Sequence, residues 1–110
     1  MSVLYEKSDR IATITINRPQ ALNSLDPEAY KEISNALINF RDDPDVWVGI
    51  ITAVGAKAFS TGADMKTMIP ALADRSYEIP PAITRGLNVW KPIIAAINGM
   101  ALGGGLELVM

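Results

Sequence analysis

Three consecutive glycines, Gly103 to Gly105, follow an apolar run, and the carboxylate of Glu107 comes two residues after them. The first N–H groups of a helix have no partner within the helix, so a strand followed by glycines and a helix start exposes backbone donors. The missing side chains let a ligand come close to the backbone. Such a place suits a phosphate group or an oxygen that gains negative charge during a reaction.

An oxyanion site explains this stretch better than a phosphate site does. GGGLEL at 103–108 lacks the Lys-Ser/Thr of a Walker loop, and the chain has no G-x-G-x-x-G. A carboxylate in the next turn would repel phosphate, whereas a neutral carbonyl gains its charge only in the transition state. Gly104 and Glu107 are three residues apart and share one side of a helix, so Glu107 can move a proton or orient water there. The alternative is a tight turn in which Glu107 only complements the helix N-terminus.

The stretch KAFSTGADMK at 57–66 repeats this pattern of strand, small residues, glycine and helix cap. Ala63 would present a backbone N–H at a helix start, and Asp64 is typical of an N-cap. An oxyanion hole usually needs two donors, and Ala63 and Gly104 are the two glycine-flanked candidates. The alternative is a surface turn with a cap.

Composition excludes several kinds of chemistry. The chain contains no cysteine and no histidine, which removes disulfides, thiol nucleophiles, the commonest general base and most zinc sites. Acid/base chemistry must therefore use Asp, Glu, Lys or Tyr, and we expect no metal. The net charge is −2 without a Lys/Arg cluster, so neither a nucleic acid nor a membrane is an expected partner. The longest nearly apolar segment, 92–102, is too short to span a bilayer, and a cytoplasmic location is expected.

Hydrophobic periodicity predicts an α/β chain. Strands are expected at 3–5, 11–16, 46–53 and 92–97, with a loop or short strand at 55–60. Helices are expected at 27–41 after an Asp26 cap, from Asp64 through Met68, at 83–90, and from Leu106 onward. Residues 69–81 carry three prolines and are expected to form a mobile loop. Trp47 and Trp90 are expected to pack in the core.

Four stretches together identify a family. They are NRPQALNSL at 17–25, KAFSTGADMK at 57–66, KPIIAAINGMALGGG at 91–105, and the glutamate at 107. In order and spacing they resemble the enoyl-CoA hydratase/isomerase (crotonase) superfamily, over essentially the whole chain. The resemblance implies a crotonase-like spiral of β-β-α units. Residues 1–110 would form the N-terminal part of a single domain whose C-terminal helices, which make trimers or hexamers in the family, are absent.

The resemblance also implies a substrate and a set of contacts. Coenzyme A would enter as an acyl thioester, with no covalently bound cofactor, and the thioester carbonyl would lie between the N–H groups of Ala63 and Gly104. Contacts to the CoA moiety are implied for Ala21, for Ala58 and Ser60 near the adenine, and for the stretch Ala63, Asp64, Met65 and Lys66.

Glu107 matches the first of the two glutamates with which hydratases of this family add water across the 2,3 double bond. The second lies beyond Met110 in the family pattern. We therefore expect residues 1–110 to be part of a longer enzyme, a truncated product, or one half of a split enzyme with a complementary C-terminal chain. Three functions stay open: an enoyl-CoA hydratase, a non-catalytic CoA-binding or interaction half that needs a partner, and a Δ3,Δ2-enoyl-CoA isomerase.

Overall fold

Two β-sheets and three α-helices make up the computed structural model, which describes residues 1–75 and 77–110. A four-stranded sheet has the order β1-β2-β3-β5, and β4 pairs with β6 in a second, two-stranded sheet. The strands are β1 (Val3–Ser8), β2 (Ile11–Ile16), β3 (Val48–Ala53), β4 (Ala58–Ser60), β5 (Ile93–Ala95) and β6 (Met100–Ala101). The helices are α1 (Pro27–Asp42), α2 (Met65–Ala73) and α3 (Gly104–Val109), with a 3-10 turn η1 (Pro19–Ala21).

The larger sheet combines a hairpin with parallel strands. Asp9 and Arg10 both have positive φ, 52° and 68°, as a two-residue hairpin turn requires, and β1 pairs antiparallel with β2. β2 and β3 are parallel, so the chain must cross over between them, and α1 lies in that connection. β5 then adds parallel to β3. The expected order of strand, strand, helix and strand is confirmed.

The core lies between the sheet and α1. Ala12, Ile14 and Ile16 on alternate positions of β2 are buried, as the alternation predicts. The buried face of α1 includes Ile33 and Leu37. Asp26 accepts a hydrogen bond from the Ala29 N–H and Pro27 opens the helix, so the predicted helix start is confirmed.

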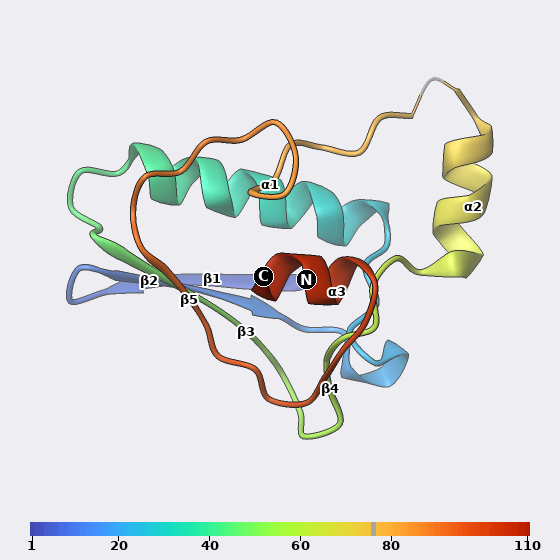
Figure 1. Ribbon diagram of the computed structural model, residues 1–110, viewed down its shortest axis with the longest axis horizontal. Helices are drawn as coiled ribbons and strands as arrows, with labels where there is room; N and C mark the ends of the chain where they lie inside the picture. The colour runs from blue at the N-terminus through green and yellow to red at the C-terminus, as the bar shows by residue number, and fades with distance from the viewer. Residues whose placement is uncertain (76) are drawn as a thin grey trace.

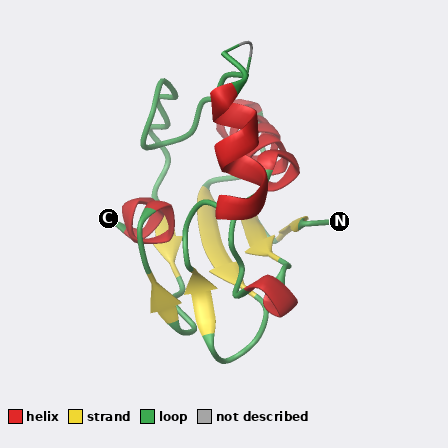
Figure 2. Ribbon diagram, turned by 90° about the vertical axis from the view of Figure 1, so that its right-hand side faces the viewer, coloured by secondary structure: helices red, strands yellow, loops and turns green. Residues whose placement is uncertain are grey.

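The views in Figures 1 and 2 show how the helices sit around the strands. α1 runs along the sheet, and α2 lies beyond one end of it (Figure 1). α1 and α2 gather on one side of the strands, whereas α3 lies apart from them (Figure 2). The chain ends overlap in Figure 1 but lie on opposite sides in Figure 2. No helix in residues 1–75 and 77–110 combines the length and the hydropathy that a bilayer span requires.

Asn23 joins the two sheets from inside the molecule. Its side chain is 1% exposed, and its amide donates to the carbonyls of Val54 at 3.0 Å and Ala58 at 2.8 Å. Its Oδ1 accepts from the Arg18 N–H at 2.8 Å. A buried amide with all these partners fixes the loops that lead into β4.

Three predictions about segments are wrong. Residues 83–90 are not helical: Ala82 and Arg85 exchange two backbone hydrogen bonds, each 2.8 Å, and close a tight turn. Gly86 follows with φ +73°, which no α-helix contains. The helix predicted to end at Met68 continues to Ala73, with Pro70 inside it. The loop predicted for 69–81 is therefore wrong for its first five residues, and only the later part lacks regular structure among the described residues. Ser76 lies outside the described residues.

Both tryptophans are exposed, so their expected core positions are also wrong. Trp47 is 62% exposed and Trp90 is 94% exposed. Trp47 lies just before β3 and packs its ring against the Arg10 guanidinium, whose carbon is 5.1 Å from the ring centroid. Trp90 lies outside the regular elements that bury side chains.

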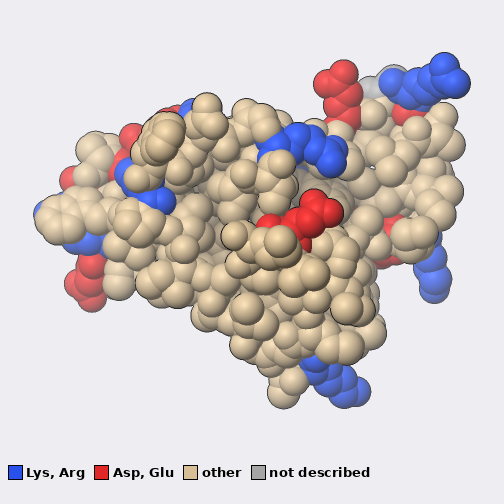
Figure 3. All heavy atoms as spheres, viewed as in Figure 1, with Lys and Arg blue, Asp and Glu red and all other residues tan. Residues whose placement is uncertain are grey.

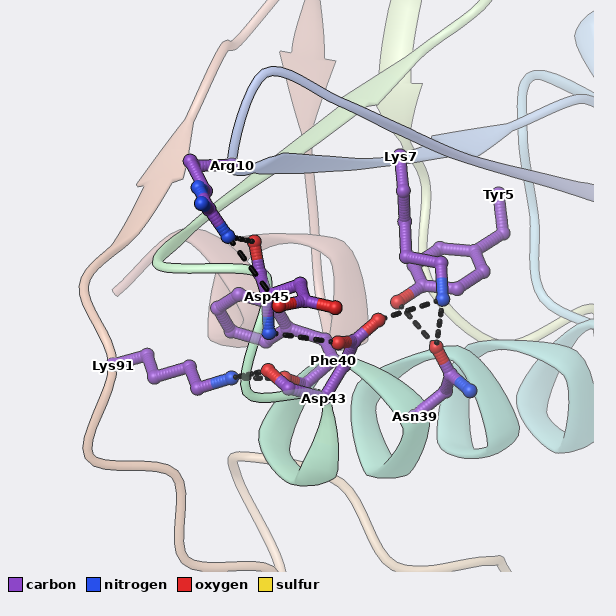
Figure 4. A network of polar contacts seen from close by, with 8 residues as sticks. All are labelled: Tyr5, Lys7, Arg10, Asn39, Phe40, Asp43, Asp45 and Lys91. Carbon is purple, nitrogen blue, oxygen red and sulfur yellow. Dashed lines mark hydrogen bonds and ion pairs between the residues drawn. The ribbon is translucent and has the colours of Figure 1, made fainter.

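Polar side chains fasten the C-terminal end of α1 to its surroundings (Figure 4). Lys7 on β1 forms an ion pair with Asp43 at 2.8 Å, and this hydrogen bond lowers the pKa of the Asp43 carboxyl. The Tyr5 hydroxyl donates to Asn39 Oδ1 at 2.9 Å. Lys91 donates from Nζ to the Phe40 carbonyl at 2.7 Å and to the Asp43 carbonyl as well. A lysine that bonds the last carbonyls of a helix satisfies acceptors with no partner within that helix.

Replacing Lys91→Met should lower the free energy of unfolding by about 1–3 kcal/mol, because two carbonyls at the end of α1 lose a charged donor while the apolar stem is kept. Urea unfolding followed by circular dichroism measures the change. Lys31→Met is the control, since the Lys31 ammonium has no partner among the described residues and lies exposed on α1. Equal losses in the two variants would contradict the capping role.

Candidate functional site

Two stretches of backbone pass each other so closely that side chains cannot fit between them. A Cβ on Gly62 would lie 2.9 Å from the Gly104 nitrogen, and a Cβ on Gly105 would press into the Ser60 carbonyl. Gly62 also has φ +89° and Gly103 φ +53°, which favour glycine. β4 and β6 pair just beside this crossing. The sequence therefore places glycines where residues 60–62 and 103–105 touch.

Pairing with Leu25 fixes the direction of the Ala63 peptide. The Leu25 N–H donates to the Gly62 carbonyl at 2.7 Å, and the Asp64 N–H donates to the Leu25 carbonyl at 2.9 Å. Ala63 lies between these two bonds, so its own N–H points away from Leu25. A Cβ on Gly104 would lie 4.0 Å from the Ala63 nitrogen. Neither the Ala63 nor the Gly104 N–H has a hydrogen-bond acceptor in the described part of the chain.

Arg18 ties the starts of α1 and α2 together. Its Nη1 pairs with Asp26, the cap of α1, and its Nη2 pairs with Asp64 at 2.8 Å. Asp64 also accepts from the Lys66 N–H at 3.0 Å, so the predicted cap of α2 is confirmed. All three charged side chains are 15–17% exposed. Because Asp64 follows Ala63 directly, this ion-pair network holds the peptide that carries the Ala63 N–H.

A pocket opens beside Gly104, and Glu107 lines it. α3 begins at Gly104, so Gly104 and Glu107 lie in its first turn and both face this pocket. The remaining lining is mostly apolar and comes from Leu25, Tyr30, Ile33, Ile79, Pro80, Ala82, Thr84, Arg85 and Leu108. Figure 3 shows acidic and basic atoms close to each other at the centre of this face, with uncharged atoms around them and further charged groups toward its edges.

The Tyr30 hydroxyl projects toward the turn that contains Gly104. A Cβ on Gly104 would lie 3.3 Å from it, and this hydroxyl has no hydrogen-bond partner within residues 1–75 and 77–110. Burial raises the pKa of the Tyr30 phenol, the negative charge of Glu107 raises it further, and the Arg85 cation opposes the shift. Tyr30 therefore stays a neutral donor near neutral pH.

Most residues predicted to contact CoA line one depression, which is separate from the pocket that contains Glu107. Ala21, Ala63, Asp64, Met65 and Lys66 all contribute to it, with Gln20, Leu22, Ser24 and Thr61. The ammonium of Lys66 is available there because the residue is exposed.

Ala58 and Ser60 lie apart from this depression. Both are buried, and Ser60 Oγ accepts from the Gly62 N–H at 3.1 Å. Ala58 lines a separate hollow with Lys57 and Asn23. Their contact with CoA stays a prediction.

Sequence reasoning missed two side chains of the pocket, Tyr30 and Arg85. No sequence motif includes Tyr30, and Arg85 lies within residues 83–90, which the periodicity predicts to be helical. The signal for Tyr30 is its position one turn after the Asp26 cap, at the end of α1 that meets residues 63–64. Nothing in the local pattern links position 85 to 104, because the turn at 82–85 brings it there.

Comparisons with known proteins agree on one family. The model of the enoyl-CoA hydratase/isomerase family matches residues 6–110. The (E)-benzylidenesuccinyl-CoA hydratase of Thauera aromatica is 43% identical over 100% of this chain and 44% of its own length. The crotonyl-CoA hydratase of Syntrophomonas wolfei is 40% identical over 99% of this chain and 44% of its own length.

Solved structures of such enzymes share the fold. A carnitinyl-CoA hydratase from Mycobacterium avium superposes with a TM-score of 0.81 at 35% identity, over 97% of this chain and 42% of its own. An enoyl-CoA hydratase from Mycobacterium tuberculosis gives a TM-score of 0.77 at 36% identity, over 98% of this chain and 44% of its own. The chain thus spans less than half the length of these relatives and has the incomplete crotonase-like fold that the sequence predicts.

Gly105→Ala should unfold or severely destabilise the protein, by more than about 3 kcal/mol, because the added methyl group would lie 2.8 Å from the Ser60 carbonyl carbon, which is backbone. Gly104→Ala is the matched control. Its one tight contact would be with the Tyr30 hydroxyl at 3.3 Å, which can shift, and its contacts with backbone, at 3.7 Å and beyond, are ordinary, so its cost should stay below about 1 kcal/mol. Thermal unfolding of both variants measures the difference. A Gly105→Ala protein as stable as Gly104→Ala would show that the crossing is looser than described.

Tyr30 should make stability depend on pH in alkaline solution. The folded chain keeps the phenol proton to a pH above the ordinary pKa of 10.0, so the free energy of unfolding falls as pH rises past that value. Tyr30→Phe should make this decline shallower between about pH 9 and 11 and change stability little at pH 7. Burial also raises the pKa of the Tyr5 phenol, so Tyr5 still contributes to the alkaline loss of stability in the variant. Unchanged slopes in urea unfolding would refute the shift.

Proposed function

Since this chain belongs to the enoyl-CoA hydratase/isomerase family, we propose that its protein binds acyl-CoA thioesters and adds water to a 2-enoyl-CoA. Hydratase names among the relatives support the reaction class. The chain covers less than half of those relatives, so the reaction is assigned to the polypeptide or assembly that contains residues 1–110.

The observation that carries the proposal is a pair of free backbone donors beside a carboxylate. Within residues 1–75 and 77–110 the N–H groups of Ala63 and Gly104 have no acceptors and their peptides lie close together, and Glu107 lines the same pocket as Gly104. A thioester oxygen that accepts both hydrogen bonds is stabilised most when it carries negative charge. Backbone donors held by Leu25 and the glycine crossing need no rearrangement during the reaction.

Polarising the thioester carbonyl withdraws electrons from the conjugated double bond and makes its third carbon electrophilic. The oxygen of water then bonds to that carbon, the carbonyl takes enolate character, and a proton adds to the second carbon. Glu107 accepts a proton from the water or delivers one to the second carbon. The matching second carboxylate of the family pattern would come from beyond Met110, in the rest of the protein or in a complementary chain.

CoA would lie along the depression lined by Ala21, Asp64, Met65 and Lys66, with its thioester reaching past Ala63. The Lys66 ammonium is suited to a phosphate of CoA. A homo-oligomer, trimeric or hexameric, and a cytoplasmic location complete the proposal. An isomerase would use the same donors but would shift a proton instead of adding water.

Glu107→Gln tests the assignment in the longest natural polypeptide, or co-purified assembly, that contains residues 1–110. The variant should bind a saturated acyl-CoA within about threefold of the parent protein, yet hydrate crotonyl-CoA at least about a hundredfold more slowly, because proton transfer typically contributes that much. Calorimetry measures binding, and product analysis measures hydration.

The control is Glu28→Gln, a carboxylate in the first turn of α1 that does not line the pocket. It should leave both quantities unchanged. Parent protein that yields 3-enoyl product and no 3-hydroxyacyl product would favour the isomerase. Unchanged hydration in Glu107→Gln would remove Glu107 from the mechanism, and a parent protein that binds CoA thioesters without turnover would favour the non-catalytic alternative.

A further inference from the structure

We propose that Arg85, assisted by Tyr30, recognises a carboxylate on the acyl group, so that the preferred substrate is the CoA thioester of a dicarboxylic acid. The inference deepens the proposed function and rests on it. Family membership leaves the acyl group open, because the names of the relatives refer to different acyl groups.

The first observation is that the turn fixes Arg85 at the pocket. The Ala82 N–H donates to the Arg85 carbonyl and the Arg85 N–H donates to the Ala82 carbonyl, both at 2.8 Å. This reciprocal pair closes a tight turn around Ile83 and Thr84. Ala82, Thr84 and Arg85 from the turn all line the pocket that Gly104 and Glu107 enter. The turn thus fixes the backbone position from which the Arg85 side chain extends beside the proposed acyl site.

The second observation is that the Arg85 guanidinium has no anionic partner in the described part of the chain. No carboxylate within residues 1–75 and 77–110 lies within 4.0 Å of it, whereas Arg10, Arg18 and Arg41 each form an ion pair. Glu107 lines the same pocket without pairing with it. A planar cation with five donors, at the edge of a pocket of apolar residues, is well suited to bind a carboxylate through two hydrogen bonds.

The third observation is the unused hydroxyl of Tyr30. It lines the same pocket and has no hydrogen-bond partner within the described residues. Tyr30, Arg85 and Glu107 come from three separate segments and line this one pocket. A protonated phenol can donate a third hydrogen bond to a carboxylate that Arg85 holds.

Charge balance favours an anionic acyl group. Glu107 alone would repel a second carboxylate in this pocket, and the Arg85 cation offsets that repulsion. An uncharged aliphatic chain would instead leave the exposed guanidinium to water and offer no acceptor to the Tyr30 hydroxyl. The CoA phosphates are a different anion, but the depression that Lys66 lines does not include Arg85, and the pocket that Arg85 lines does not include Lys66.

Matched pairs of saturated thioesters test the proposal in the same full-length protein. Succinyl-, glutaryl- and adipoyl-CoA are compared by calorimetry with butyryl-, pentanoyl- and hexanoyl-CoA, which have equal chain lengths and the same CoA phosphates. For at least one length the carboxylate form should bind roughly tenfold tighter, since hydrogen bonds to charged groups contribute about that much. Arg85→Gln should abolish the preference, Arg85→Lys should keep part of it, and Tyr30→Phe should reduce it about threefold.

Arg41→Gln is the matched control, because Arg41 lies at the far end of α1 and pairs only with Asp42 among the described residues. It should leave the preference intact. Equal weakening of both thioester classes in Arg85→Gln would mean a contact to CoA itself and would overturn the proposal.

Three further outcomes also decide the matter. If the parent protein shows no preference at any length but still hydrates crotonyl-CoA, the carboxylate site is wrong and the hydratase assignment stands. If Arg85→Gln slows crotonyl-CoA hydration and shifts its pH profile without altering the preference, Arg85 acts on Glu107 and not on substrate. If neither class of thioester binds to the parent protein, the proposed function fails, and this inference fails with it.

Discussion

Direct contact between two stretches of backbone is the constraint on which the rest of this structure depends. Residues 60–62 meet residues 103–105 with no side chain between them, and Gly99 passes so close to the Lys57 carbonyl that a Cβ there would lie 2.5 Å from it. β4 and β6 can pair only because of this approach. The pocket beside Gly104 and the start of α3 both depend on this crossing, whereas pairing with Leu25 sets the direction of the Ala63 N–H.

The ion pairs of Arg18 help to hold the backbone beside the close approach that the glycines permit. Arg18 bonds the caps of both α1 and α2, and its side chain is largely enclosed. Desolvating three charged groups is expensive unless each is well partnered, and here the aspartates also accept backbone N–H groups at the helix starts. The network therefore does more to fix the relative positions of Leu25 and Ala63 than to add stability.

The strands, α1 and the two capped helix starts could be predicted because their signals are local. Alternation in β2 and the Asp26-Pro27 pair each act within a few residues. The helix predicted for 83–90 is wrong because the helical spacing of Ile83, Leu87 and Trp90 does not reveal the turn at 82–85. The reciprocal hydrogen bonds between Ala82 and Arg85 close this turn instead. The core position predicted for Trp47 is wrong because that prediction rests on residue type alone, and the position of Trp47 just before β3 leaves it outside the core.

In the candidate site, too, residues with local sequence signals could be predicted, and residues that meet only through the fold could not. The glycines, the two backbone donors and Glu107 could be predicted from sequence patterns, although their roles remain predictions. Tyr30 and Arg85 could not, because positions 30, 85 and 104 come together only through the packing of α1, the 82–85 turn and α3. Local spacing cannot encode a contact among three separate segments.

The donors proposed for the thioester oxygen belong to peptide bonds and not to side chains, and this affects which substitutions the protein can accept at these positions. A codon change at position 63 alters what hangs from the α-carbon but leaves the amide hydrogen in place, with proline as the single exception among the twenty residues. The neighbouring glycine codons have no such freedom, since every replacement at Gly62 meets the backbone of Gly104. Natural variation should therefore accumulate beside the donors and stop abruptly at the glycines that frame them.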